Sequence, residues 1–203
     1  YRRWLDPTMS YSAALYSSDG ERSMASAQLA KYRRILRSIG ARPGDRILEI
    51  GCGWGGFAET AAREAGAEVH GVTLSPSQLA WAEERLRVAG LDSQVQLELR
   101  DYRDLSGEYD HIVSIEMFEA VGERWWSTYF GQLSRLLKPE GRALIQTITI
   151  RDDLFARYRR GTDFIQQYVF PGGMLPSPAV FARSAQRSGL AVRDAFAFGP
   201  DYA

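Results

Sequence analysis

LEIGCGWGGF, residues 48–57, carries the strongest structural signal in this sequence. Its glycines Gly51, Gly53 and Gly56 lie between an apolar segment, residues 46–50, and a helical pattern over residues 57–65. Glycines at such a strand-to-helix turn allow a tight bend and a close approach of the backbone to a ligand, and the helix N-terminus favours an anionic group. The spacing G-x-G-x-x-G does not define the ligand by itself, because dinucleotide-binding enzymes and ordinary turns also contain it.

GVTLSPSQ, residues 71–78, argues against a dinucleotide. A dinucleotide site usually has an acidic residue about 20 residues after the glycines to hold the ribose hydroxyls, and this segment contains no carboxylate. Thr73, Ser75 and Gln78 offer hydroxyl and amide groups that could bind a ribose instead. The alternative interpretation is helix capping, with Ser75 as the N-cap before Pro76.

Strands and helices alternate through most of the chain. We expect helices over residues 22–39, 57–65, 76–89, 125–137 and 179–188, and strands over residues 46–50, 68–73, 95–99, 110–115, 143–150 and 191–198. This alternation predicts a mostly parallel sheet covered by helices on both faces. The first helix has a basic side, which we expect to be solvated and which consists of Lys31, Arg33, Arg34 and Arg37.

Composition indicates one globular domain. The chain has 203 residues, 45% of them hydrophobic, and its 25 Lys and Arg balance 25 Asp and Glu, so charge indicates no nucleic-acid partner. The single cysteine, Cys52, excludes an intrachain disulfide and a multi-cysteine metal site and fits a reducing compartment. No apolar run reaches the roughly 18–20 residues of a membrane span. We expect a cytoplasmic protein with peripheral contact to the inner membrane face and no catalytic metal; the oligomeric state is not predicted.

Four further motifs follow the glycine segment LEIGCGWGGF along the chain. In order, they are GVTLSPSQLAWAEER, DYRDL, SIEMFEAVGERWW and FIQQYVFPGGMLPS. Together they resemble the cyclopropane-fatty-acid synthase family, which includes the mycolic-acid cyclopropane synthases. The match runs from LDPTMSYS, residues 5–12, to FGPDY, residues 198–202. The resemblance implies an α/β, Rossmann-like class I methyltransferase that uses S-adenosylmethionine. Its mostly parallel sheet would have seven strands, with the last strand and the lid beyond Ala203.

The resemblance also implies how the chain is organised. Residues 1–203 would form one methyltransferase domain, in which residues 1–40 cover the cofactor and residues 151–178 form an acyl-binding insertion. The family's motifs assign cofactor binding to three groups of residues: Tyr11, Ser12, Gly51 and Gly53 at the methionine end, Thr73 and Gln78 at the ribose, and Asp101 and Tyr102 at the adenine. For Tyr102 the alternative is a surface aromatic residue beside a turn.

The substrate implied by the family is an unsaturated fatty acyl chain, which we expect to be part of a phospholipid. Its double bond attacks the methyl group of the cofactor, which leaves a carbocation, so the site must supply a dry pocket, negative charge and a base. Aromatic rings could also stabilise the cation; the candidates, each with core packing as the alternative, are Phe118, Tyr168, Phe170 and Tyr202. We expect both histidines, His70 and His111, to be structural.

The family's base is a bound bicarbonate, and this sequence keeps only part of its ligand set. Ala13 stands at the cysteine position of YSCAY, and Gln146 stands at a histidine position, whereas Glu119 and Tyr202 remain. The backbone amide of Ile148 could still contribute to the site. The altered site should hold the anion less well, which makes the use of bicarbonate doubtful.

Glu116 stands where many family members have glycine. Its carboxylate, beside Glu119, could replace the anion as proton acceptor, since a buried pair of acids shifts one pKa into a useful range. The alternative is a helix N-terminal acid stabilised by the helix dipole. The catalytic candidates are therefore Glu119, Tyr202, Glu116 and Gln146. We predict a methyl-branched or methylene product over a cyclopropane; the competing functions are methylation of a small soluble substrate and cofactor binding without catalysis.

Overall fold

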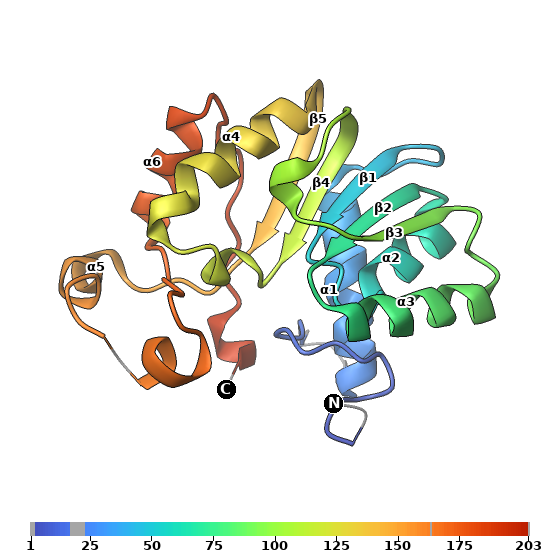
Figure 1. The fold of residues 1–203 in the computed structure, drawn as a ribbon, viewed down its shortest axis with the longest axis horizontal. Coiled ribbons are helices and arrows are strands. Elements are labelled where there is room, and N and C mark those ends of the chain that lie inside the picture. Colours follow the sequence, from blue (N-terminus) through green and yellow to red (C-terminus); the bar gives the residue numbers. More distant parts are fainter. Residues whose placement is uncertain (1–2, 17–22, 163, 203) are drawn as a thin grey trace.

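A five-stranded parallel sheet forms the centre of the molecule (Figure 1). The structure is a computed structural model that describes residues 3–16, 23–162 and 164–202, with Tyr202 described by its backbone alone. The strand order is β3-β2-β1-β4-β5, and the strands are β1 (Arg46–Ile50), β2 (Glu68–Thr73), β3 (Val95–Leu99), β4 (Tyr109–Ile115) and β5 (Leu137–Gln146). The direction of the strand order reverses between β1 and β4, which is where sheets of this kind bind ligands.

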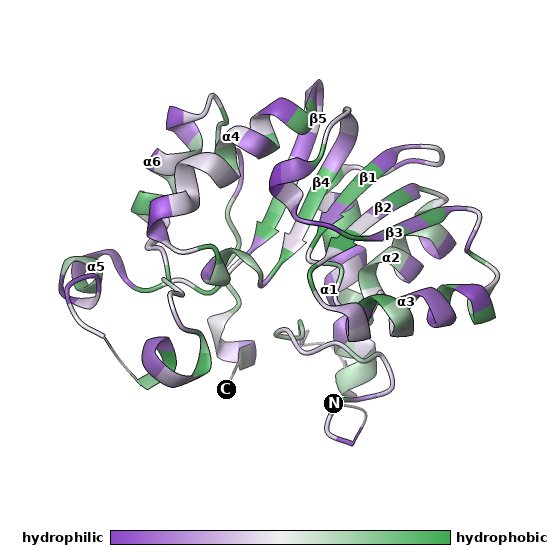
Figure 2. Ribbon diagram, in the orientation of Figure 1, coloured by the Kyte–Doolittle hydropathy of each residue, from purple (hydrophilic) through white to green (hydrophobic). Residues whose placement is uncertain are grey.

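Helices cover both faces of the sheet, and each face has its own core. On one face lie α1 (Met24–Ile39), α2 (Gly56–Thr60) and α3 (Pro76–Ala89), and on the other lie α4 (Trp126–Leu136) and α6 (Pro178–Arg187). Adjacent residues of β1 serve the two cores: Ile47 packs with the first group of helices and Leu48 with the second. Hydrophobic residues accordingly concentrate in the middle of the sheet (Figure 2).

Shorter elements complete the connections. A π-helical turn, Ala61–Ala65, continues α2, and 3₁₀ turns cover Tyr102–Asp104, Phe118–Ala120, Glu123–Trp125 and Gly199–Tyr202. Helix α5 (Asp152–Tyr158) and a second π-helical turn, Ile165–Val169, lie beyond the carboxyl ends of the strands (Figure 1). Among the described residues, no helix has both the length and the apolar character needed to cross a bilayer.

The helix starts follow the predicted capping chemistry. Ser75 accepts a hydrogen bond from the backbone of Gln78, and Pro76 occupies the first turn of α3. Ser177 caps α6 in the same way. Serine at the N-cap satisfies a backbone N–H that has no partner inside the helix. The bounds predicted for α3 are confirmed, and so are those predicted for the strands β1, β2 and β3.

Two predicted strands differ from the structure. Residues 191–198 form no strand, because residues 191–197 are exposed and an alternating pattern specifies a strand only where one face is buried. The described sheet thus has five strands where seven were expected for the whole fold. Strand β5 begins at Leu137 and not at Ala143, and it ends at Gln146 and not at Ile150. It ends early because the amide of Ile148 donates to the Glu119 side chain and that of Ile150 donates to the Pro176 carbonyl.

The predicted solvated basic side of α1 is confirmed for Arg33 and Arg37, which are exposed, and is wrong for Lys31. Lys31 is only 2% exposed. Arg33 makes two hydrogen bonds of 2.8 Å to Glu64, and the guanidinium of Arg34 lies 3.6 Å from the centre of the Phe196 ring. Helical periodicity placed these side chains on one side but could not reveal that other segments pack against it.

Candidate cofactor and active site

The predicted site residues follow the carboxyl ends of all five strands. Gly51 follows β1, Thr73 ends β2, Asp101 follows β3, Glu116 follows β4 and Gln146 ends β5. Because the strands are parallel, these ends share one edge of the sheet, and the N-terminal segment, residues 8–14, lies beside it (Figure 1). The topology therefore brings candidates from the whole chain to one edge.

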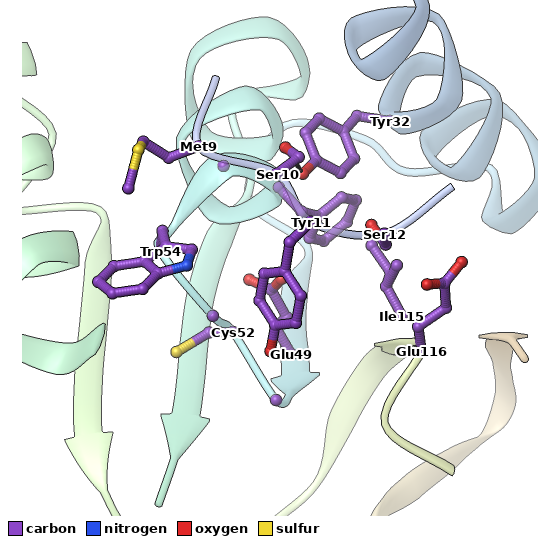
Figure 3. Close-up of a pocket in the computed structure, with 14 residues that line it drawn as sticks. Met9, Ser10, Tyr11, Ser12, Tyr32, Glu49, Cys52, Trp54, Ile115 and Glu116 are labelled. Carbon is purple, nitrogen blue, oxygen red and sulfur yellow. Dashed lines mark hydrogen bonds between the residues drawn. The ribbon is translucent and has the colours of Figure 1, made fainter. Parts of the chain in front are cut away.

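A pocket lies over the glycine turn (Figure 3). Its walls come from residues 9–12, from α1, from the end of β1 with the turn that follows, and from the end of β4. Five predicted residues line this pocket, namely Tyr11, Ser12, Gly51, Gly53 and Glu116. Figure 3 shows Ser12 and Glu116 on one side and Trp54 on the other, with Tyr11 and Glu49 between them.

The turn needs glycine for two different reasons. Gly51 and Gly53 have positive φ angles of +83° and +52°, which side chains disfavour. Gly56 is required by space instead, because a Cβ there would lie 2.9 Å from the Tyr32 hydroxyl. The amides of Gly51 and Cys52 both donate to the Val72 carbonyl, which fixes the turn to β2.

The predicted ribose-binding residues contact one another beside the pocket. The hydroxyl of Thr73 donates to Gln78 Oε1 at 2.9 Å, and Gln78 Nε2 donates to the Tyr11 hydroxyl at 3.3 Å. Gln78 therefore links the end of β2 to the N-terminal segment. Ser75 has the capping role that was the alternative interpretation.

Asp101 and Tyr102 do not line the pocket. The Asp101 carboxylate pairs with Arg103 at 2.6 Å, and this hydrogen bonding lowers the pKa of Asp101. The half-buried ring of Tyr102 packs edge-on against Tyr129 with centroids 5.5 Å apart, so it is not a surface aromatic residue. Contact of these two residues with adenine remains a prediction.

Hydrogen bonds fasten the N-terminal segment on two sides. From α1, Gln28 Nε2 donates to the Ser12 carbonyl at 2.7 Å and Lys31 Nζ donates to Ser12 Oγ at 2.5 Å. From the end of β4, the carboxylate of Glu116 accepts from the amide of Ala13 at 2.9 Å. The segment that covers the pocket is thus held between α1 and the active-site edge.

Glu116 has an unusual backbone and a well-defined carboxylate. Its φ angle of +48° lies in the left-handed region, which costs a non-glycine residue about 1–3 kcal/mol. Its Oε1 accepts from the Ala13 amide and also from Gln146 Nε2 at 2.8 Å, while its own amide donates to the Gln146 carbonyl. These partners differ from those of a helix N-terminal acid, whose carboxylate would accept from the amides of the following turn.

Glu119 lies close enough to Glu116 for their charges to interact, and both side chains are partly buried. One of its carboxylate oxygens accepts from the Ile148 amide, and the other has no hydrogen-bond partner among the described residues. Burial is the main cause that raises the pKa of Glu119; hydrogen bonds from Ile148 and Thr147 oppose this, and the charge of Glu116 adds to it. The Ile148 amide, expected to help hold an anion, is therefore used by Glu119.

The sequence analysis missed Glu49, which also lines the pocket. This residue is 3% exposed, its Oε2 has no partner among the described residues, and burial raises its pKa well above the usual carboxyl range. The available signal was a carboxylate inside the otherwise apolar strand ILEI, residues 47–50. A buried carboxylate without a partner at a pocket is a candidate for binding a cation or a hydrogen-bond donor.

The aromatic candidates have different surroundings. Phe118 is fully buried in the core, stacked on Trp126, whereas Tyr168 is 68% and Phe170 is 59% exposed. The side chain of Tyr202 lies outside the described residues.

Both histidines have ordinary side-chain partners. His70 bonds to the Tyr109 hydroxyl at 2.6 Å, and His111 lies 3.2 Å from an Asp45 carboxylate oxygen. Neither lines the pocket over the glycine turn.

A parallel sheet with this strand order, a glycine turn at its reversal point and a covered pocket defines a Rossmann-like class I methyltransferase, a class that uses S-adenosylmethionine. The chain belongs to the mycolic acid cyclopropane synthetase family, whose model matches residues 1–203. The family expected from the sequence is thereby confirmed.

Individual relatives agree with this assignment. The chain is 40% identical to the tuberculostearic acid methyltransferase UfaA1 of Mycobacterium tuberculosis, over all of this chain and 49% of the relative. It is 42% identical to the cyclopropane-fatty-acyl-phospholipid synthase of Escherichia coli K12, over all of this chain and 50% of the relative. The chain therefore spans about half the length of these curated relatives.

Solved structures share the fold closely. The cyclopropane synthase MmaA2 from Mycobacterium tuberculosis aligns with a TM-score of 0.89 at 27% identity, over 99% of this chain and 73% of that one. The mycolic acid cyclopropane synthase CmaA1, in complex with SAH and CTAB, aligns with a TM-score of 0.85 at 31% identity, over 95% of this chain and 70% of that one.

Proposed function

We propose that this chain is the catalytic core of an S-adenosylmethionine-dependent methyltransferase that acts on the double bond of an unsaturated acyl chain in a phospholipid. Family membership supports methyl transfer to a lipid. The observation that carries the proposal is the pair of carboxylates, Glu116 and Glu119, beside a pocket suited to the cofactor. This pair also argues against a domain that only binds the cofactor.

The pocket residues fit the cofactor. The glycine turn leaves backbone without side chains at Gly51 and Gly53, and the orphan oxygen of Glu49 could accept from an ammonium group. Tyr11 and Ser12, which line the pocket, would cover the methionine end, and Thr73 and Gln78, which are hydrogen-bonded to each other, would bind the ribose. When bound, the cofactor supplies an electrophilic methyl group.

The acidic pair supplies what the substrate needs after methyl transfer. An alkene that takes up a methyl cation becomes a carbocation, which buried negative charge stabilises and which must then lose a proton. We assign the negative charge beside the cation to Glu119 and the proton acceptor to Glu116. Gln146 and the Ala13 amide hold one oxygen of Glu116, so this carboxylate occupies donors that could otherwise bind an anion.

The position of the base determines the product. Loss of a proton from the added methyl closes a cyclopropane, whereas loss from a neighbouring chain carbon leaves a methyl-branched alkene. A base fixed on the protein in place of bicarbonate favours the open product. Overall identity does not separate the two outcomes, because relatives at 40% and 42% identity carry the names of a methyltransferase and a cyclopropane synthase.

Glu116→Gly tests this assignment in the full-length protein. We expect turnover to fall at least about 100-fold, the loss typical for a positioned acid or base, with the cofactor still bound. Mass spectrometry of lipids from expressing cells identifies the product. A wild-type enzyme that makes only cyclopropane, at a rate that rises with added bicarbonate, would contradict the proposal.

A further inference from the structure

Lys31 is a buried cation that the proposed reaction does not use. It projects from α1, is 2% exposed, and donates to Ser12 Oγ at 2.5 Å. Its nitrogen also lies 4.9 Å from the centre of the Tyr32 ring. Among the described residues no carboxylate oxygen lies within 4.0 Å of this nitrogen, so no ion pair neutralises it. An ammonium group has three donors, and burying it with a single neutral acceptor is unfavourable.

A second buried ionisable group, a carboxyl, lies at the same pocket. Glu49 lines the pocket, is 3% exposed and has an orphan carboxylate oxygen. Ser12, the hydroxyl partner of Lys31, lines the pocket as well. The pocket is thus bordered by a carboxyl oxygen of Glu49 that has no hydrogen-bond partner among the described residues, and by the Ser12 hydroxyl, which accepts from the buried ammonium of Lys31. A ligand with one positive and one negative group could donate to the Glu49 oxygen and also offset the charge of the Lys31 ammonium.

We propose that Lys31 is a positioning residue for the carboxylate of an α-amino-acid group, the methionine end of the cofactor. Its charge acts through the hydroxyl of Ser12, while Glu49 accepts from the ammonium of the same group. This inference rests on the proposed cofactor site and adds to it the charge that recognises the zwitterionic end. A purely structural Lys31, which only anchors the N-terminal segment, is the competing explanation.

Two ligands separate these explanations. S-adenosylhomocysteine carries the amino-acid end, whereas 5′-methylthioadenosine keeps the nucleoside and the thioether but lacks that end. Calorimetric titration of the full-length protein with both ligands measures the contribution of the amino-acid end alone. We expect Lys31→Met to weaken S-adenosylhomocysteine about 10- to 100-fold, the range for loss of a hydrogen-bonded charge, and to leave 5′-methylthioadenosine within about twofold.

Gln28→Leu is the matched control, because Gln28 also holds Ser12 from α1 but carries no charge. We expect any loss in this variant to be shared by both ligands, since Tyr11 and Gln78 connect the same segment to the ribose side. Lys31→Gln keeps a donor near Ser12 without the charge and serves where Lys31→Met does not fold; its loss should again be confined to S-adenosylhomocysteine.

Equal losses for both ligands in the Lys31 variants, or no loss for S-adenosylhomocysteine, would overturn the inference. Failure of the wild-type protein to bind either ligand would refute the proposed cofactor site itself, which is a different result.

Discussion

Glu116 combines a backbone conformation that disfavours side chains with a carboxylate held by two donors. A residue under strain is retained where its side chain has a task, which is why strained positions concentrate at functional sites. Its carboxylate joins the N-terminal segment at Ala13 to the end of β5 at Gln146. We therefore infer that Glu116 both shapes the site and acts in it.

Glu119 should be indispensable for either product. Glu119→Gln removes the negative charge beside the carbocation but keeps the size and an acceptor for the Ile148 amide. We expect turnover to fall by about 10²- to 10³-fold, as for loss of a preorganised electrostatic group, with cofactor affinity nearly unchanged. Steady-state rates together with calorimetry measure both quantities; retention of more than half of the activity would exclude this role.

The protonation of Lys31 should appear in the pH dependence of ligand binding. Burial lowers the pKa of Lys31 to about 8, and the three carboxylates that raise it, Glu116, Asp6 and Glu49, do not compensate. Since only the protonated form attracts a carboxylate, affinity for S-adenosylhomocysteine should decrease as the pH rises through about 8. Lys31→Met should lack this dependence, and titrations between pH 6.5 and about 9.5 test it.

The titration of Lys31 should affect the stability of the ligand-free protein in the opposite direction: stability should increase with pH where ligand affinity decreases. A lowered pKa means that the folded, ligand-free protein binds the Lys31 proton less tightly than the unfolded chain does. Stability therefore rises with pH above about 8 and stops rising near the unfolded pKa of about 10.4. A bound carboxylate would offset the free-energy cost of burying the Lys31 ammonium.

At the scale of elements, the glycine turn between β1 and α2 forms the floor of the pocket. Gly53→Val places a branched side chain at a positive φ and into the space above the turn. We expect loss of S-adenosylhomocysteine binding, measured by calorimetry, in a variant that still folds. Gly131→Ala is the control, because a Cβ at Gly131 meets no atom within 4 Å. Unchanged affinity in folded Gly53→Val would disprove the site.

We propose that the segment of residues 151–178, which contains α5, contacts lipid. Its π-helical region exposes Phe164, Tyr168 and Phe170, and Arg157 and Arg160 of the neighbouring segment are exposed as well. Aromatic and cationic side chains together suit a membrane interface. On α1, Arg33 is paired with Glu64, so it is less available to a lipid surface.

At the scale of the whole molecule, the proposed membrane contact can be tested on vesicles. Charge reversal at Arg157 and Arg160 should weaken sedimentation with anionic phospholipid vesicles, since each arginine contributes about 1 kcal/mol near such a surface. Arg37→Glu, at an exposed position of α1, should change binding little. Binding that is insensitive to salt and to both reversals at α5 would eliminate the membrane contact.

Much of the architecture followed from local sequence. Periodicity and capping residues predicted β1, β2, β3 and α3 with their bounds, because these elements depend on neighbouring residues. The absence of a carboxylate in residues 71–78 argued against a dinucleotide, and the resemblance to the cyclopropane-fatty-acid synthase family implied S-adenosylmethionine. The same sequence suggested a strand over residues 191–198, and this failed because strand formation needs a partner and a buried face, which periodicity does not supply.

The sequence by itself therefore determined the sheet, the turn and the family, whereas the tertiary structure decided which groups are buried and what they contact. Lys31 was expected in solvent and lies under Ser12. The sequence left two interpretations of Glu116 open, and the structure shows that its carboxylate accepts from the amide of Ala13, 103 residues away. Local patterns specify elements over a few turns, but burial and hydrogen bonding at a site depend on segments that meet only when the sheet brings its strand ends together.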